Sequence, residues 1–109
     1  GVVCAALLPH TVDINIKALK KRAPDHPSLR KFDEAARIMT NDPTANATDG
    51  VVWLQTLCNE LQIPGLSDYG IQTEHFGDII EKSKNASSMK GNPIKLTDEE
   101  LRIILERAL

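Results

Sequence analysis

The chain has 109 residues, of which 41% are hydrophobic and 26% charged, the usage of an ordinary globular domain. The formal net charge is −2, so the chain as a whole is not built to bind polyanions such as nucleic acids. No apolar stretch of the sequence reaches the roughly 20 residues that a membrane span requires. We therefore expect one cytoplasmic domain over residues 1–109, with an aliphatic core because aromatic residues make up only 4% of the chain.

The first residues form an apolar segment with no helix-capping residue before it. Gly1 stands where a start methionine would be, and residues 2–8 already have the composition of a buried helix. The first amide donors of a helix need a capping partner, and none is available ahead of this segment. We therefore expect these 109 residues to be the back end of a longer polypeptide.

Helical periodicity continues through the first half of the chain. Pro9 is expected either to interrupt the first helix or to open a second one, which then runs to a cationic last turn at residues 20–22. Ser28 is expected to cap the next helix, whose apolar face is Leu29, Phe32, Ala36 and Met39. After a loop at 41–47, Thr48 or Asp49 is expected to cap a third helix with the stripe Val51, Leu54, Cys58 and Leu61.

The second half of the chain is also predicted to be helical. Residues 66–72 are expected to form an ordered loop, and Thr73 to start a fourth helix. Thr97 and Glu100 have the spacing of a capping box. They open a last helix with the apolar face Leu101, Ile104, Leu105 and Ala108. The sequence therefore predicts an all-α, multi-helix bundle.

Cysteine and histidine give no pattern typical of a catalytic or metal site. Cys4 and Cys58 lie in apolar helical segments, and both are expected to be free and buried. None of the three histidines has a second ligand at a metal-binding spacing. His10 is expected to be a helix-end residue bonded to backbone carbonyls, with a polar group bordering an active site as the alternative. His26 and His75 are expected to be solvated surface residues.

One cluster of cations lies in the first third of the chain. Its members are Lys17, Lys20, Lys21, Arg22, Arg30 and Lys31. A contact to nucleic acid or phosphate is one interpretation of such a cluster. Because no aromatic residues are interleaved and the chain is acidic overall, a solvated helix end is favoured, and nucleic acid is not expected as a partner.

Four segments together resemble the iron-containing (group III) alcohol dehydrogenases. Residues 1–15 resemble a family stretch in which small and aliphatic residues lead into Leu8-Pro9-His10, with an Asn five residues later. The segment from Leu57 to Pro64, with Leu66 after it, resembles the family's Leu…Leu-x-Ile-Pro-x-x-Leu, here with one residue rather than two between Pro64 and Leu66. Tyr69-Gly70-Ile71 and Gly91-Asn92-Pro93 follow in the family's order. The resemblance covers essentially the whole chain.

This resemblance implies an architecture and an activity for the complete protein. Family members are two-domain, dehydroquinate synthase-like dehydrogenases, with a nucleotide-binding α/β domain followed by an all-helical domain. They transfer hydride between NAD or NADP and an alcohol–aldehyde or alcohol–ketone pair, with Fe²⁺ or Zn²⁺ in the cleft between the domains. By this alignment the last metal-binding His directly precedes Gly1. No catalytic, cofactor-binding or metal-binding residue is therefore expected among the 109.

One position can be carried over from the family's substrate cavity. Met89 falls where some members place a small or Cys side chain near the substrate. The expected partners are the N-terminal domain of the same chain and a small alcohol or aldehyde. A homo-oligomer stays open, and no membrane partner is expected. The piece alone is expected to be inactive, and the rival hypothesis is a stand-alone helical module that binds protein or nucleic acid through residues 17–31.

Overall fold

A computed structural model describes residues 2–109, apart from the side chains of Val2, Ser87 and Ser88. This part of the chain contains five α-helices, three short 3₁₀ helices and no strand, which confirms the all-α prediction. The α-helices are α1 (Val2–Arg22), α2 (Pro27–Thr40), α3 (Ala47–Glu60), α4 (Phe76–Lys84) and α5 (Asp98–Ala108). The 3₁₀ helices are η1 (Leu66–Tyr69), η2 (Thr73–His75) and η3 (Ser87–Gly91).

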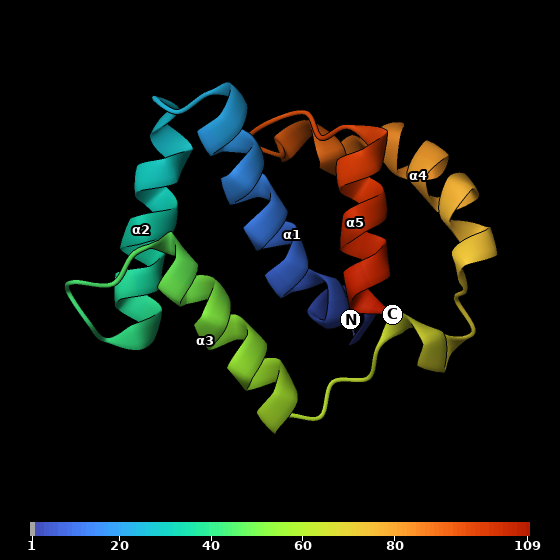
Figure 1. The fold of residues 1–109 in the computed structure, drawn as a ribbon, viewed down its shortest axis with the longest axis horizontal. Coiled ribbons are helices and arrows are strands. Elements are labelled where there is room, and N and C mark those ends of the chain that lie inside the picture. The colour runs from blue at the N-terminus through green and yellow to red at the C-terminus, as the bar shows by residue number, and fades with distance from the viewer. Residues whose placement is uncertain (1) are drawn as a thin grey trace.

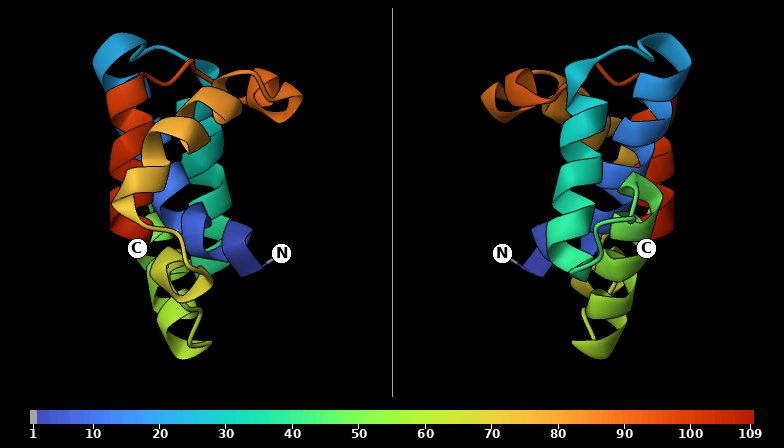
Figure 2. Two further views of the ribbon diagram at one scale, coloured as in Figure 1. Left: turned by 90° about the vertical axis from the view of Figure 1, so that its right-hand side faces the viewer. Right: turned by 90° about the vertical axis from the view of Figure 1, so that its left-hand side faces the viewer.

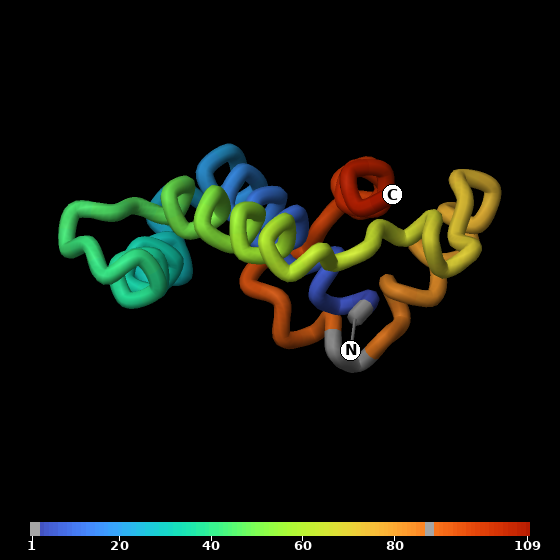
Figure 3. The backbone as a smooth tube through the Cα atoms, turned by 90° about the horizontal axis from the view of Figure 1, so that it is seen from below, coloured from blue at the N-terminus to red at the C-terminus, as the bar shows by residue number. Residues whose placement is uncertain are grey.

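The long helix α1 is the centre of the bundle. It packs against α3 on one side and α5 on the other, while α2 pairs with α3 and α4 with α5 (Figure 1). Seen nearly along α5, the α2–α3 pair and α4 lie at opposite ends of the molecule (Figure 3). Its dimensions of 42 × 32 × 21 Å describe a flattened shape.

Two apolar clusters hold these layers together. Ile16 of α1 and Val51 of α3 belong to one cluster, against which the half-buried Leu29 and Phe32 of α2 pack. The larger cluster lies on the other side of α1 and is closed by the whole predicted face of α5. Its buried members are Ile14, Ala18, Leu66, Phe76, Ile80, Leu96, Leu101, Ile104, Leu105 and Ala108.

Pro9 neither interrupts α1 nor opens a new helix, so both predicted outcomes are wrong. The helix continues through it from Val2 to Arg22. Proline has no N–H, which leaves the carbonyl of Ala5, four residues earlier, without its helical donor. The Cys58 thiol of α3 donates to that carbonyl at a sulfur–oxygen distance of 3.6 Å. The missing backbone bond is thus replaced by a tertiary contact.

The N-terminal caps of α2 and α3 differ from the predicted ones. His26 rather than Ser28 caps α2, because its Nδ1 accepts the Ser28 amide at 3.1 Å. Asn46 rather than Thr48 or Asp49 caps α3. The Asp49 amide donates to Asn46, and the Asp49 carboxylate accepts the Asn46 amide in return. His26 is therefore a structural cap and not a solvated loop residue.

Smaller corrections concern exposure and helix starts. Both cysteines are free, but Cys4 is exposed and Cys58 half-buried, so neither is the fully buried residue predicted. Leu61 is 63% exposed because α3 ends one residue earlier. The predicted helix at Thr73 begins as η2 and becomes α-helical only at Phe76. The segment 66–72, predicted to be an ordered loop, begins with the 3₁₀ helix η1 over Leu66–Tyr69. The Thr97–Glu100 capping box is confirmed.

Glycine allows two close approaches that shape the bundle. A Cβ added to Gly50 of α3 would lie 2.9 Å from the Cβ of Ala36 in α2, so the two helices meet at this point. A Cβ on Gly65 would overlap the Leu109 carbonyl oxygen. The same oxygen accepts a hydrogen bond from the Ser67 hydroxyl at 2.9 Å. The segment before η1 is therefore fitted against the end of α5.

Candidate functional site

A hydrogen bond between two side-chain amides joins the segment around Leu8-Pro9-His10 to the segment Gly91-Asn92-Pro93. Asn15 of α1 is only 3% exposed, and its Oδ1 accepts a hydrogen bond from Asn92 Nδ2 at 2.6 Å. The second Asn92 hydrogen goes to the Ile94 carbonyl at 2.5 Å. The Asn15 amide itself donates to the Thr11 carbonyl at 2.9 Å. The segment after η3 is thereby fixed to the central helix.

The half-buried Met89 lies between two neighbouring cavities. An inner cavity of about 160 Å³, partly open to solvent, is lined mainly by apolar side chains of α1, α4 and α5, among them Leu7, Ile79 and Leu105. An outer cavity of about 280 Å³ is lined by three lysines and by apolar side chains. The side chains that line both cavities are Met89, Asn92, Leu96 and Leu101. Met89 thus lies in a hollow, as a substrate-cavity residue should, although its role stays a prediction.

Two segments project from one side of the molecule. The first turns of α1 and the segment of η3 both leave the bundle in the same direction (Figure 2). Val3 and Leu8, in these first turns, are 37% and 47% exposed. The start of α1 therefore offers exposed apolar side chains.

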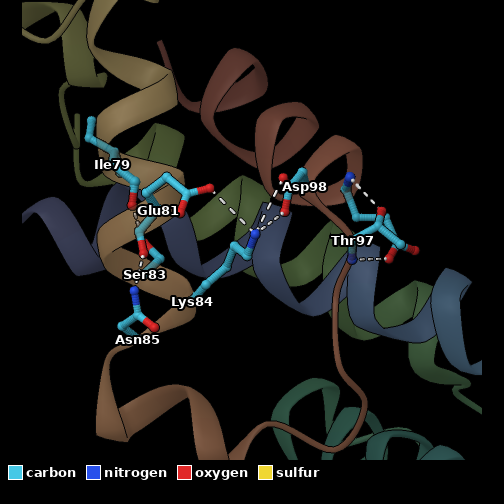
Figure 4. A network of polar contacts seen from close by, with 8 residues as sticks. Ile79, Glu81, Ser83, Lys84, Asn85, Thr97 and Asp98 are labelled. Carbon is cyan, nitrogen blue, oxygen red and sulfur yellow. Dashed lines mark hydrogen bonds and ion pairs between the residues drawn. The ribbon is translucent and has the colours of Figure 1, made fainter.

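Ion pairs fix α4 and α5 at the edge of the outer cavity. Lys84 Nζ lies 3.1 Å from an Asp98 carboxylate oxygen and 3.4 Å from Glu81 Oε1 (Figure 4). The hydrogen bond to Asp98, helped by both negative charges, raises the pKa of Lys84 above its ordinary value. Next to this pair, Thr97 and Glu100 complete the capping box of α5.

A third hollow, of about 470 Å³, lies around His10 between α1, the end of α3 and the end of α5. His10 is in the body of α1, and its buried Nδ1 has no hydrogen-bond partner among the described residues. The expectation that backbone carbonyls satisfy it is therefore wrong. Burial and then the nearby Arg107 charge lower the pKa of His10, against the opposing effect of Asp13. Both effects disfavour the protonated, charged form of the imidazole.

Ion pairing leaves the predicted cationic cluster only partly free. Lys17 and Arg107 both contact the Asp13 carboxylate, at 2.9 and 2.7 Å. Burial alone would raise the pKa of Asp13, but these two hydrogen-bonded cations hold it below its ordinary value. Arg22 contacts Glu100 at 2.8 Å and also donates to the Lys95 carbonyl. The other four members of the cluster are exposed side chains.

The residues present do not form a metal site by themselves. Within the described part of the chain, no three His, Cys, Asp or Glu side chains come together as possible ligands. His26 and His75 each use Nδ1 to accept a backbone amide.

A comparison with known protein families identifies the family of this chain. The sequence model of the Fe-containing alcohol dehydrogenase family, C-terminal, matches residues 1–109. The chain belongs to this family. The resemblance predicted from the four segments is thereby confirmed, as is the all-helical C-terminal fold. No curated protein and no solved structure showed a significant match.

Membership gives a family context to the Asn15–Asn92 contact. The sequence patterns that carry the resemblance include Leu8-Pro9-His10 with Asn15, and Gly91-Asn92-Pro93. In this iron-containing alcohol dehydrogenase domain, the hydrogen bond between Asn15 and Asn92 brings the two patterns to one place. Within residues 2–109 no helix is both long and apolar enough to cross a membrane.

Sequence reasoning missed two features of the site. The lysines around the outer cavity were not recognised, although Lys90 and Lys95 stand on either side of Asn92-Pro93. The contact between Cys58 and the Ala5 carbonyl was also missed. Pro9 and Cys58 lie far apart in the sequence, so this contact can be predicted only once it is known that α1 packs against α3.

Proposed function

We propose that these residues form the helical wall of the active-site cleft in an NAD(P)-dependent alcohol dehydrogenase. The complete enzyme would transfer hydride between the nicotinamide and an alcohol–aldehyde or alcohol–ketone pair. The observation that carries the proposal is the family match over the whole of residues 1–109. Iron or zinc and the dinucleotide would be held by residues outside this set, as the family resemblance implies.

The role proposed for this chain is to hold the wall rigid beside the reacting groups. The Asn15–Asn92 bond supports this role because it ties the segment carrying Met89 to α1. The Cys58 thiol supports it as well, since it satisfies a carbonyl in the helix start nearest the predicted metal ligand. A substrate held within fractions of an ångström gains much of its rate from such fixed surroundings.

A second domain of the same polypeptide is the proposed partner of the projecting side. Val3 and Leu8 are large apolar side chains with 37% and 47% of their surface exposed, which favours a protein contact. A cytoplasmic location and a homo-oligomer stay predictions.

The proposal is tested by comparing the complete protein with a polypeptide limited to residues 1–109. Both are loaded with Fe²⁺ or with Zn²⁺ and given NAD or NADP together with ethanol, 1-butanol or 2-propanol. The formation of reduced nicotinamide is then measured. We expect metal-dependent turnover by the complete protein alone, with circular dichroism verifying that the shorter polypeptide is helical. Turnover by the shorter polypeptide would show that the chemistry lies within it and refute the scaffold role.

The rival interaction-module hypothesis is tested in the same preparations. Binding of a labelled DNA duplex that weakens steeply with salt is the signature of phosphate contacts. Such binding, in a complete protein that shows no dehydrogenase turnover, would replace the enzyme proposal. No binding, together with turnover, would support the proposal.

A further inference from the structure

The two cavities on either side of Met89 have opposite character. The inner cavity is walled mainly by aliphatic side chains, including Leu7, Ile80 and Leu105. The outer cavity has Lys84, Lys90 and Lys95 around it. Because the two cavities share four lining residues, an apolar wall and a cationic wall lie close together, which suits a molecule that is apolar at one end and anionic at the other.

The three lysines do not contribute equally to the charge of the outer cavity. The positive charge of Lys84 is paired with the carboxylates of Asp98 and Glu81, neither of which lines the cavity. Lys90 and Lys95 are exposed, and neither forms an ion pair with a carboxylate in the described part of the chain. Their two positive charges remain available to a ligand.

The backbone that carries these two lysines is fixed from both sides. Asn92, between them, is bonded to Asn15 and to the Ile94 carbonyl. The Lys95 carbonyl accepts a hydrogen bond from Arg22 at 2.8 Å. Because the segment is already ordered, a ligand would have to immobilise only the lysine side chains, which lowers the entropic cost of binding.

We propose that these two cavities form one site for a small carboxylate with an apolar body. The carboxylate lies at Lys90 and Lys95, and the apolar body passes Met89 into the inner cavity. An apolar cavity of roughly 150 Å³ is large enough for benzene, so the inner cavity of about 160 Å³ takes a group of that size. The proposal concerns binding alone and does not depend on hydride transfer.

Three probes that share one ring and differ in charge test the proposal directly. Phenylacetate, 2-phenylethanol and 2-phenylethylamine are titrated into the complete protein without cofactor, and binding is followed by calorimetry and saturation-transfer NMR. We expect phenylacetate to bind tightest and 2-phenylethylamine weakest. Added salt should weaken phenylacetate binding and leave 2-phenylethanol unchanged, because salt screens only the charged interaction.

Variants locate the site. The double substitution K90Q/K95Q is expected to weaken phenylacetate binding about twofold to thirtyfold, the range for two solvent-accessible charge contacts, without changing 2-phenylethanol binding. The matched control K20Q/K31Q removes two exposed lysines that line neither cavity and should change nothing. Met89→Leu, a conservative change, should weaken both probes by a similar factor.

Several outcomes would overturn the proposal. The first is equal affinity for the three probes. The second is that none of the probes binds at millimolar concentration. The third is an equal loss of phenylacetate affinity in K90Q/K95Q and in K20Q/K31Q. Dehydrogenase activity is not part of this readout. A failure here therefore leaves the proposed function standing, and a failure of that function leaves this site standing.

Discussion

The hydrogen bond between Asn15 and Asn92 should contribute measurably to stability, and a double-mutant cycle can isolate it. Asn15→Ala leaves one donor of the half-buried Asn92 amide without its acceptor, and Asn92→Ala leaves Asn15 Oδ1 unpaired in a residue only 3% exposed. A buried polar group without a partner costs about 1–3 kcal/mol. We therefore expect each single variant to lose about 1–3 kcal/mol of unfolding free energy.

The double variant separates the shared bond from the rest of each side chain. The 2.6 Å contact is counted in both single variants. The double variant should therefore be more stable than the sum of the two losses implies, by about 1 kcal/mol. Urea unfolding followed by circular dichroism gives the four free energies. Asn59→Ala, at an exposed position of α3, is the control and should change little.

Additivity within about 0.3 kcal/mol would refute the reasoning, because groups without interaction give independent losses. It would mean that the two amides do not support each other in solution. The segment after η3 would then be held to α1 by apolar packing alone.

Two further predictions concern glycine packing and pH. Gly50→Ala should lower the free energy of unfolding by about 1–3 kcal/mol through overpacking, since its Cβ would lie 2.9 Å from that of Ala36. Gly77→Ala, with open space around it, should raise the free energy of unfolding by about 0.5–1 kcal/mol. If urea unfolding shows that both variants change the free energy in the same direction, the close approach of α2 and α3 at Gly50 is contradicted. The pKa of His10 is lower in the folded chain than its ordinary value of about 6.5. As the pH falls, the unfolded chain therefore binds a proton at His10 before the folded chain does. The free energy of unfolding should consequently fall as the pH drops below about 7. His10→Gln should flatten this dependence between about pH 7 and 5, and parallel curves for variant and wild type would contradict it.

The last helix shows what the sequence determines locally. The capping box and the four buried positions of α5 follow from spacing alone, and the structure has all of them. Thr97 and Glu100 each accept the other's backbone amide hydrogen bond within one turn. The apolar residues of α5 lie on one face, which packs against one surface of the bundle. Neither feature depends on distant contacts, so both could be predicted.

The caps of α2 and α3 and the course of α1 show where local information ends. Asn46, Thr48 and Asp49 can all cap a helix, and the choice of Asn46 depends on which side chain Asp49 reciprocates. At Pro9 the local rule is a break, yet a thiol from another helix satisfies the freed carbonyl. The central helix is also buried on two sides, at Ile14 as well as Ile16. A single apolar stripe could not account for both sets of contacts.

The candidate site depends on both kinds of information together. Asn15 and Asn92 are each ordinary in the sequence, because one asparagine in a helix and one before a proline occur in many proteins. Their order along the chain supports the family resemblance, and their hydrogen bond gives a physical reason for it. A change that frees Asn92 would release Met89 and the lysine-bearing segment together. We therefore expect Asn15→Ala to weaken phenylacetate binding as well as folding, although Asn15 lines neither cavity.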